Sequence, residues 1–302
     1  MKKLNIPTKI FQNYIKDKDI RTFKKNIFYF FFYRLLRNFF NHSLVVKIQN
    51  FYVLSSHKKN KASYSLIQKC DFFDVAEIQL IKRVSKTNQI CFVDCGSNFG
   101  FYSLFVMSLS PNNRVISIEA SAKTNQEFKE NLLLNNFKNI KNLNLAVSDK
   151  DNDIVELKES EKDWESSIIE LDYNVKNLSK VKTIKIDTIL SKENLDGKKL
   201  IFKIDVEGSD LNVLAGAEKS IKLFKPLIII EFSKYILNNK EFDYNYLDTF
   251  LKVNDYKIYD NYGKNIKLYD ILSRLDKLDK YHKTIGNYYL VGIESDLNFI
   301  KK

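Results

Sequence analysis

One short glycine-containing stretch carries the residues best suited to bind a ligand. It reads Asp-Cys-Gly-Ser-Asn-Phe-Gly over residues 94–100, after an apolar run at 90–93 and before a helical pattern at 101–110. This order of strand, turn and helix directs backbone N–H groups and a helix N-terminus toward a ligand. The glycines are expected because a side chain there would block close approach of the backbone. The residues predicted to bind the ligand are Asp94, Gly96, Ser97, Asn98 and Gly100.

The acid at the start of this loop narrows the class of ligand. Two glycines spaced G-x-x-x-G after Asp94 depart from the dinucleotide pattern G-x-G-x-x-G. A carboxylate at this position would repel a pyrophosphate, but it can receive a cationic amino group through the hydrogen bonds of the loop. S-adenosylmethionine carries an ammonium and a sulfonium and no phosphate. The loop therefore favours S-adenosylmethionine, and a purely structural turn is the alternative.

Two further sites are expected at the ends of the next two strands. Glu119 lies 25 residues after Asp94 and is followed by Ala120. A carboxylate there accepts hydrogen bonds from both ribose hydroxyls in other doubly wound nucleoside sites. Ser148 and Asp149 end the third predicted strand, where an adenine ring would lie, although Asp149 equally suits a turn.

Acidic residues also follow the fourth and fifth predicted strands. Ligands of open α/β sheets bind beyond the carboxyl ends of the strands, so these acids are expected to project toward the methyl donor. Lys203 is expected either to partner them or to cover the sheet with its stem. The predicted catalytic residues are Asp205, Glu207 and Glu231, with Asp205 also in the cofactor set and His282 as a weaker alternative base. No metal is predicted, because nothing supplies the remaining ligands of an ion at Asp205 and Glu207.

The elements that position these residues alternate between short β-rich runs and longer helical patterns. Strands are predicted at 90–94, 114–119, 143–147, 200–205 and 227–231, and helices at 101–110, 124–136 and 209–224. This alternation is typical of a doubly wound parallel sheet. A helix at 244–253 and strands at 256–260 and 287–293 would complete seven strands. Residues 148–196, with possible strands at 154–157 and 181–186, form the expected substrate-facing insertion.

The charge of the chain is concentrated near its N-terminus. Residues 1–85 hold 17 Lys and Arg against 5 Asp and Glu, whereas residues 86–302 hold 32 of each. We therefore divide the chain into a basic, aromatic-rich, mostly helical N-terminal extension (1–85) and a catalytic domain (86–302). A basic segment of this kind favours a partner such as anionic lipid, an acidic glycan or nucleic acid.

The aromatic run at 27–40 is too short to span a bilayer, which needs about 20 apolar residues. Its large side chains recur at helical spacing, at Phe28, Phe31, Phe32, Leu35, Leu36 and Phe39. This stripe is expected either to pack on protein or to lie on a membrane surface. Three cysteines without metal-site spacing, and no recognisable signal peptide, favour a cytoplasmic protein. Peripheral contact with the inner face of the membrane is one option for the basic residues 1–85.

Several motifs in order resemble those of the FkbM family of methyltransferases. They are Phe92-Val93-Asp94-Cys95-Gly96-Ser97-Asn98-Phe99-Gly100, Ile118-Glu119-Ala120, Ala146-Val147-Ser148-Asp149, Lys203-Ile204-Asp205-Val206-Glu207-Gly208 and Pro226-Leu227-Ile228-Ile229-Ile230-Glu231. The resemblance covers residues 93–233 and implies a class I, Rossmann-like methyltransferase fold that uses S-adenosylmethionine. It further implies O-methylation of a hydroxyl on a sugar, glycan or secondary metabolite. Residues 1–85 lie outside it.

Two alternative functions remain. A nucleic-acid methyltransferase would hold phosphates with the basic N-terminal segment. However, amino-methylating enzymes of that class carry an Asn/Asp-Pro-Pro-Tyr/Phe run where this chain has Asp205-Val206-Glu207-Gly208, so nucleic acid is not the expected partner. A non-enzymatic module that binds a membrane surface is the other alternative, and the intact loop glycines together with Glu119 argue against it.

Overall fold

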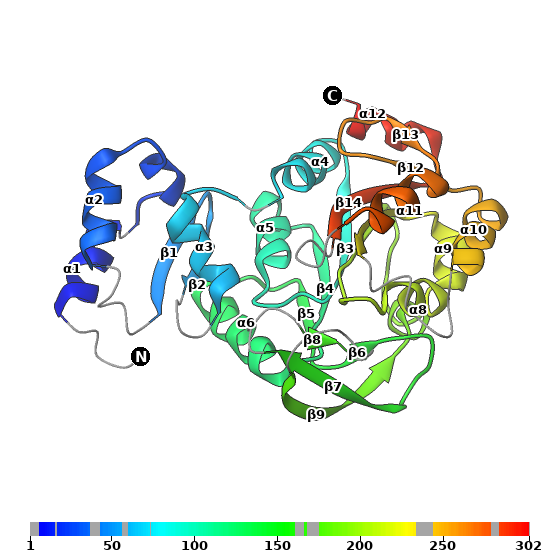
Figure 1. Cartoon of the computed structure of the whole chain (residues 1–302), viewed down its shortest axis with the longest axis horizontal. Coiled ribbons are helices and arrows are strands. Elements are labelled where there is room, and N and C mark those ends of the chain that lie inside the picture. The colour runs from blue at the N-terminus through cyan, green and yellow to red at the C-terminus, as the bar shows by residue number, and fades with distance from the viewer. Residues whose placement is uncertain are drawn as a thin grey trace.

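A computed structural model describes residues 6–15, 17–36, 43–55, 60–72, 74–160, 166–167, 175–233, 244–278 and 284–301 (Figure 1). The predicted His282 and Phe39 lie outside these residues. None of the described helices is long and apolar enough to cross a membrane.

The centre of the fold is an eight-stranded sheet with the order β13-β12-β14-β11-β10-β3-β4-β5. Its strands are β3 (Gln89–Cys95), β4 (Arg114–Ile118), β5 (Ile140–Leu143), β10 (Lys198–Ile204), β11 (Leu227–Ser233), β12 (Lys257–Tyr259), β13 (Asn265–Ile266) and β14 (Thr284–Val291). Neighbouring strands from β5 to β11 are parallel, and β14 runs antiparallel to both β11 and β12. The predicted α/β, doubly wound, class I methyltransferase topology is confirmed, and the two-residue edge strand β13 adds one strand to the expected seven.

The strand predicted at 143–147 is wrong in its position. The sheet uses β5, which ends where Leu143 pairs with Ile118. Ala146–Val147 is instead β6, which pairs with β9 (Val175–Ile184) in a second sheet with β7 (Ile154–Ser160) and β8 (Ser166–Ser167). One apolar run thus serves two sheets, and the Asn144 amide turns the chain between them by donating to the carbonyls of Glu119 and Ala120.

The helix predicted at 209–224 is two helices, α8 (Asp210–Ala215) and α9 (Glu218–Phe224). The break falls at Gly216, where an added Cβ would lie 2.0 Å from the carbonyl oxygen of Ser148. The remaining helices of this part are α5 (Phe101–Leu109), α6 (Ala122–Asn135), α7 (Ile186–Leu190), α10 (Tyr244–Val253), α11 (Leu268–Asp276) and α12 (Leu297–Ile300), with the 3-10 helix η4 (Glu294–Asp296). The predicted helices at 101–110, 124–136 and 244–253 are confirmed.

Alternate residues of the central strands enter two separate cores on the two faces of the sheet. On β3, Ile90 and Phe92 join one core, whereas Cys91, Val93 and Cys95 join the other. Apolar residues on both faces explain why the central strands read as continuous hydrophobic runs. The strand ends that carry the predicted site are thereby held at one edge of the sheet.

The N-terminal extension is mostly helical, as predicted, but it also contains a β-hairpin. Its elements are α1 (Ile6–Ile15), η1 (Ile20–Phe23), α2 (Ile27–Leu36), β1 (Leu44–Ile48), β2 (Phe51–Ser55), α3 (Lys61–Lys69) and α4 (Val75–Ser85). In Figure 1, α1 and α2 lie at the end of the molecule away from the central sheet. The ring of Phe51 lies 5.9 Å from that of Phe101, and Phe72 lies 5.7 Å from Phe105. The extension therefore shares a core with the catalytic domain.

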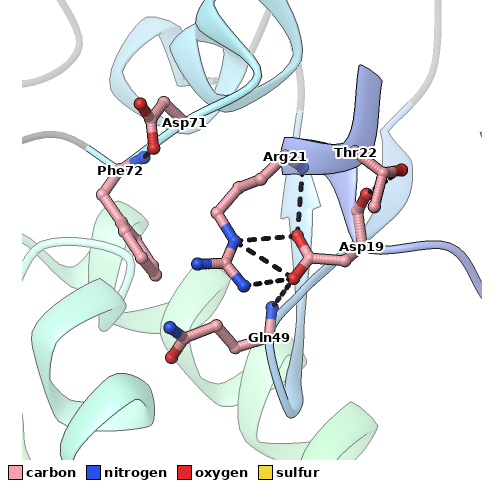
Figure 2. A network of polar contacts seen from close by, with 6 residues as sticks. All are labelled: Asp19, Arg21, Thr22, Gln49, Asp71 and Phe72. Atoms are coloured by element: carbon pink, nitrogen blue, oxygen red, sulfur yellow. Dashed lines mark hydrogen bonds and ion pairs between the residues drawn. The ribbon is translucent and has the colours of Figure 1, made fainter. Parts of the chain in front are cut away.

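A polar network fixes η1 to the hairpin (Figure 2). The Asp19 carboxylate accepts hydrogen bonds from the Arg21 side chain and from the backbone N–H groups of Arg21 and Gln49. Burial by itself would raise the pKa of Asp19, but these contacts with Arg21 hold it below its usual value. The Arg21 guanidinium also lies 5.0 Å from the centre of the Phe72 ring. This acid is thus committed to structure.

Candidate active site

The predicted cofactor loop is held against the end of β4. The backbone N–H groups of Gly96 and Ser97 both donate to the carbonyl of Ile118, at 2.9 and 3.1 Å. The next N–H, of Asn98, donates to Oε2 of Glu119 at 2.8 Å. The loop is therefore joined by hydrogen bonds to both Ile118 and Glu119.

Glu119 has a structural role that the sequence did not reveal. Its second oxygen, Oε1, accepts a hydrogen bond from the backbone N–H of Ser121 at 2.8 Å. Burial raises the pKa of this carboxyl, and the two backbone donors oppose that rise. Each carboxylate oxygen offers about two acceptor positions, so after these two donors and the Thr124 side chain Glu119 retains capacity for a ribose hydroxyl.

The fold of the loop itself requires both loop glycines. An added Cβ at Gly96 would lie 1.9 Å from the carbonyl oxygen of Asp205, and one at Gly100 would lie 2.0 Å from the Phe128 ring. Both glycines also have positive φ, which L side chains rarely adopt. Protein atoms already fill the space that a side chain would need, so the fold of the loop requires these glycines, and their role toward the ligand stays a prediction.

Ser97 supplies the clearest sign of a ligand in the loop. Its Oγ is buried and has no hydrogen-bond partner within the described part of the chain. An unpartnered buried hydroxyl costs about 1–3 kcal/mol, so this group calls for a partner such as a ligand or a bound water. Together with the surrounding carboxylates, this hydroxyl fits a polar, cationic ligand such as S-adenosylmethionine.

A buried Asp and Lys lie beneath the loop. Asp94 accepts a hydrogen bond from the Ser103 hydroxyl at 2.6 Å, and burial raises its pKa to about 6. Lys203 is fully buried, donates to Oδ2 of Asp205 at 2.7 Å and lies 5.1 Å from the centre of the Tyr102 ring. The expected pairing of Lys203 with a strand-end acid is thus observed.

The electrostatics of Lys203 connect the two parts of the site. Burial by itself would lower its pKa, but the carboxylate of Asp205, followed by those of Asp74 and Glu231, holds the pKa above its ordinary value. Lys203 therefore stays charged, and it neutralises part of an acidic cluster that extends from the cofactor loop to β11.

The turn after β10 is fixed by an acid that the sequence analysis did not select. Asp210 accepts hydrogen bonds from the N–H groups of Gly208, at 3.0 Å, and Val206, at 3.5 Å. Burial, reinforced by the charge of Asp205, raises the pKa of Asp210 to about 6. Glu207 occupies this turn with φ of 52°, partly exposed. An acid at the first position of the short helix after the turn is the signal that was available.

The residues predicted near the adenine lie where β6 meets α8. The Ser148 hydroxyl donates to Oδ1 of Asp149 at 3.0 Å, and the amide of Asn212 approaches the same oxygen at 3.4 Å. Ala120 is partly buried against the second sheet. These contacts fit the turn role for Asp149 and leave its role toward adenine a prediction.

A pocket of about 770 Å³ opens beside the acidic cluster. Glu231 lines it, next to its strand partner Asn287, and so do Asp74 and Glu77 at the start of α4. The Tyr102 hydroxyl donates to Oδ2 of Asp74 at 2.8 Å, so one aromatic ring links this wall to Lys203. Burial raises the pKa of Glu77 to about 7. Glu231 is thus a predicted catalytic acid that faces a space large enough for a small acceptor.

Comparisons with known proteins agree with this topology. The family described as Methyltransferase FkbM domain matches residues 94–258, more than half of the chain. No curated protein sequence matches the chain.

Similar solved structures are distant. The FkbM methyltransferase of Methylobacillus flagellatus is 17% identical with a TM-score of 0.40, over 75% of this chain and 52% of that one. This chain therefore spans about half the length of that relative. Precorrin-6y C5,15-methyltransferase of Geobacter metallireducens is 10% identical (TM-score 0.38, 79% and 92% covered). M. jannaschii TYW2, solved with AdoMet, is 14% identical (TM-score 0.38, 82% and 83% covered).

On the extent of the family match, the chain belongs to the FkbM family of S-adenosylmethionine-dependent methyltransferases.

Proposed function

We propose that this enzyme transfers the methyl group to a hydroxyl of a sugar, glycan or secondary metabolite. The observation that carries the proposal is the pocket beside the strand-end acids, with Glu231 in its wall. Carboxylates and amides, such as those of Glu231 and Asn287, form hydrogen bonds with hydroxyl groups of an acceptor.

The cofactor would be held by the loop at 94–100 and by the ends of β4, β6 and β10. When bound, it supplies an electrophilic methyl group. The residues assigned to it are Asp94, Gly96, Ser97, Asn98, Gly100, Glu119, Ala120, Ser148, Asp149 and Asp205. Within this set, the Ser97 hydroxyl donates or accepts one hydrogen bond, and the free positions of Glu119 accept from the ribose. Asp94 and Asp205 offset the positive charges of the cofactor's ammonium and sulfonium groups.

Glu231 is the proposed general base. Glu231 would take the hydroxyl proton as the acceptor oxygen forms the O–CH3 bond in line, while the S–CH3 bond breaks and the sulfur leaves as a neutral thioether. Asp205 is a weaker choice because its carboxylate is already bound to the Lys203 ammonium. Glu207 lies in the turn after β10, and it is not among the described residues that line the pocket. Alignment of the reactants supplies about 7–11 kcal/mol, and a positioned base adds about 10²–10⁴-fold in rate.

The test is a labelling experiment with the full chain. Methyl-labelled S-adenosylmethionine and fractionated cell extract should transfer label to a carbohydrate or small-metabolite fraction. Glu231→Gln should slow that transfer by about 10²–10⁴-fold, while cofactor affinity measured by calorimetry stays close to that of the unmodified enzyme.

Glu294→Gln is the matched control, because Glu294 is an exposed glutamate in η4. It should label its acceptor at the normal rate. Label that appears in nucleic acid would refute hydroxyl acceptors of the proposed class and favour the basic N-terminal segment as a phosphate-binding arm. Full activity of Glu231→Gln would exclude Glu231 as the base and return Asp205 to that role.

A further inference from the structure

The helix α2 carries apolar side chains on two sides, and only one of these sides packs against the rest of the protein. Tyr29 is fully buried and donates its hydroxyl proton to the carbonyl of Ile67 at 2.6 Å. Phe32, Tyr33 and Leu36 pack on the same core. The stripe predicted from the sequence thus divides, because only some of its members face protein.

The other side of α2 faces solvent. Phe28, Phe31 and Leu35 expose 76%, 69% and 59% of their surface, at the i, i+3 and i+7 positions of one helical face. Ile27 is exposed beside them, and Arg34 is exposed between Phe31 and Leu35. We call these five residues the α2 outer face. Scattered exposed apolar residues are ordinary, but a contiguous row of large ones marks an interaction site.

Positive charge surrounds this face. Residues 1–36 hold nine Lys and Arg against two Asp. One of those two, Asp19, is committed to Arg21, as Figure 2 shows. Lys25 is exposed just before α2 begins, beside Lys24, which pairs with Asp71. Lys9 is exposed on α1 between the exposed Ile6 and Ile10. The apolar row therefore lies within a cationic surface.

The apolar row and the positive charge together discriminate among three possible partners: a second copy of the chain, nucleic acid and an anionic bilayer. A second copy of the chain would bring the same positive charge to the contact and would be repelled. Nucleic acid would pair with the lysines, but aliphatic Ile27 and Leu35 offer its bases nothing to stack on. An anionic bilayer satisfies both features, because its headgroups attract the cations while its acyl boundary accepts the apolar side chains.

We propose that the α2 outer face docks this enzyme on an anionic membrane surface. The helix lies parallel to the membrane plane, with Phe28, Phe31 and Leu35 inserted at the boundary between headgroups and acyl chains. The place of α1 and α2 at one end of the molecule leaves the catalytic domain in water (Figure 1). This proposal is independent of the acceptor assigned above.

The experiment is flotation of the full chain with vesicles of phosphatidylglycerol and phosphatidylcholine in equal parts, at low salt. The unmodified protein should float with these vesicles and much less with phosphatidylcholine alone. The double variant Phe28→Ser, Phe31→Ser should lower the partition coefficient at least tenfold, since both large side chains leave the boundary. Lys25→Glu should lower it through charge, and Lys24 is left unchanged because it pairs with Asp71. Each variant changes exposed residues, and a thermal transition verifies that it is folded.

The matched control is Leu133→Ser with Leu223→Ser, two exposed leucines on α6 and α9 of the catalytic domain. This variant should float like the unmodified protein. The proposal is overturned if the unmodified chain ignores the anionic vesicles at low salt, or if the α2 and control variants lose binding equally. Binding to a single-stranded oligonucleotide that depends on Phe28 and Phe31, with no flotation, would instead assign the face to nucleic acid.

Discussion

The Ser97 hydroxyl separates a ligand contact from a structural one more cleanly than any other group in the loop. Because its Oγ lacks a partner among the described residues, removing it should not weaken the free protein. Ser97→Ala is expected to keep or slightly raise the melting temperature and to weaken S-adenosylmethionine binding about tenfold, the effect of losing one hydrogen bond. Calorimetric titration and thermal unfolding measure the two quantities.

The control for this change is Ser103→Ala. The Ser103 hydroxyl donates to Asp94, so its loss leaves a buried carboxyl with one partner fewer and should lower the melting temperature. If Ser97→Ala binds the cofactor with unchanged affinity, the assignment of Ser97 to the cofactor site is wrong.

The raised pKa of Asp94 predicts that both the stability of the protein and its affinity for S-adenosylmethionine depend on pH. Burial raises its pKa from 3.8 to about 6, so the folded protein holds this proton more tightly than the unfolded chain does. Its contribution to stability therefore falls as pH rises from about 4 to about 6 and is constant above. A cationic ligand favours the ionised carboxylate, so binding of S-adenosylmethionine should release a proton and should tighten as pH rises from 5 to 7.

The measurement is calorimetric titration in buffers of different ionisation enthalpy across this range. Asp94→Asn should bind more weakly at pH 7 and show a flatter pH profile, because its amide does not titrate. If the affinity of Asp94→Asn changes with pH as steeply as that of the unmodified protein, another group causes the pH dependence. Asp210 would be the first to examine, since its pKa is also raised to about 6.

Among the elements, the central strands were predictable and their connections less so. Residues 90–94 and 227–231 read as strands because both faces of the sheet are covered, so that every position before the terminal Asp94 and Glu231 is apolar. The single strand predicted at 143–147 was wrong because an apolar run indicates burial but does not indicate which sheet buries it. Gly216, at the break between α8 and α9, packs against the carbonyl of Ser148, a contact distant in sequence that local periodicity does not contain.

The start of α3 supports the cofactor loop directly. Asn60 is buried at the N-cap, where its Oδ1 accepts from the N–H of Ser63 and its Nδ2 donates to Oδ1 of Asn98 at 2.9 Å. Asn60→Asp keeps the cap acceptor but replaces the donor toward Asn98 with a repelling oxygen. We expect cofactor affinity to fall about two- to tenfold, the value of one net hydrogen bond.

Asn60→Ser is the matched variant, since serine also caps a helix but is too short to reach Asn98. Both variants should keep most of their thermal stability and share the loss of affinity, which calorimetry would record. Normal affinity in both would mean that the loop holds its shape without the extension.

At the scale of the whole molecule, the sequence revealed the charge division at residue 85 but not how the two sides pack. The carboxyl-edge residues Asp94, Glu119, Asp205 and Glu231 were found because strand ends converge in this topology. The contact of Phe51 with Phe101 and the bond from Asn60 to Asn98 join segments outside and inside the family resemblance. No short-range pattern encodes such contacts, because each side alone reads as an ordinary apolar or polar residue.

The last prediction concerns the dependence of the catalytic domain on its extension. Deleting residues 1–85 would remove α4 and the hairpin and expose Phe101 and Phe105, which are buried in the full chain. Each large apolar side chain that loses its burial costs about 1.5–3 kcal/mol, and several together approach the 5–15 kcal/mol that stabilises a typical domain. The fragment 86–302 should therefore aggregate or lack a cooperative thermal transition, measured by soluble yield and calorimetry. A soluble fragment that unfolds cooperatively and binds S-adenosylmethionine normally would show instead that residues 86–302 fold alone, and that the shared core contributes little to the cofactor site.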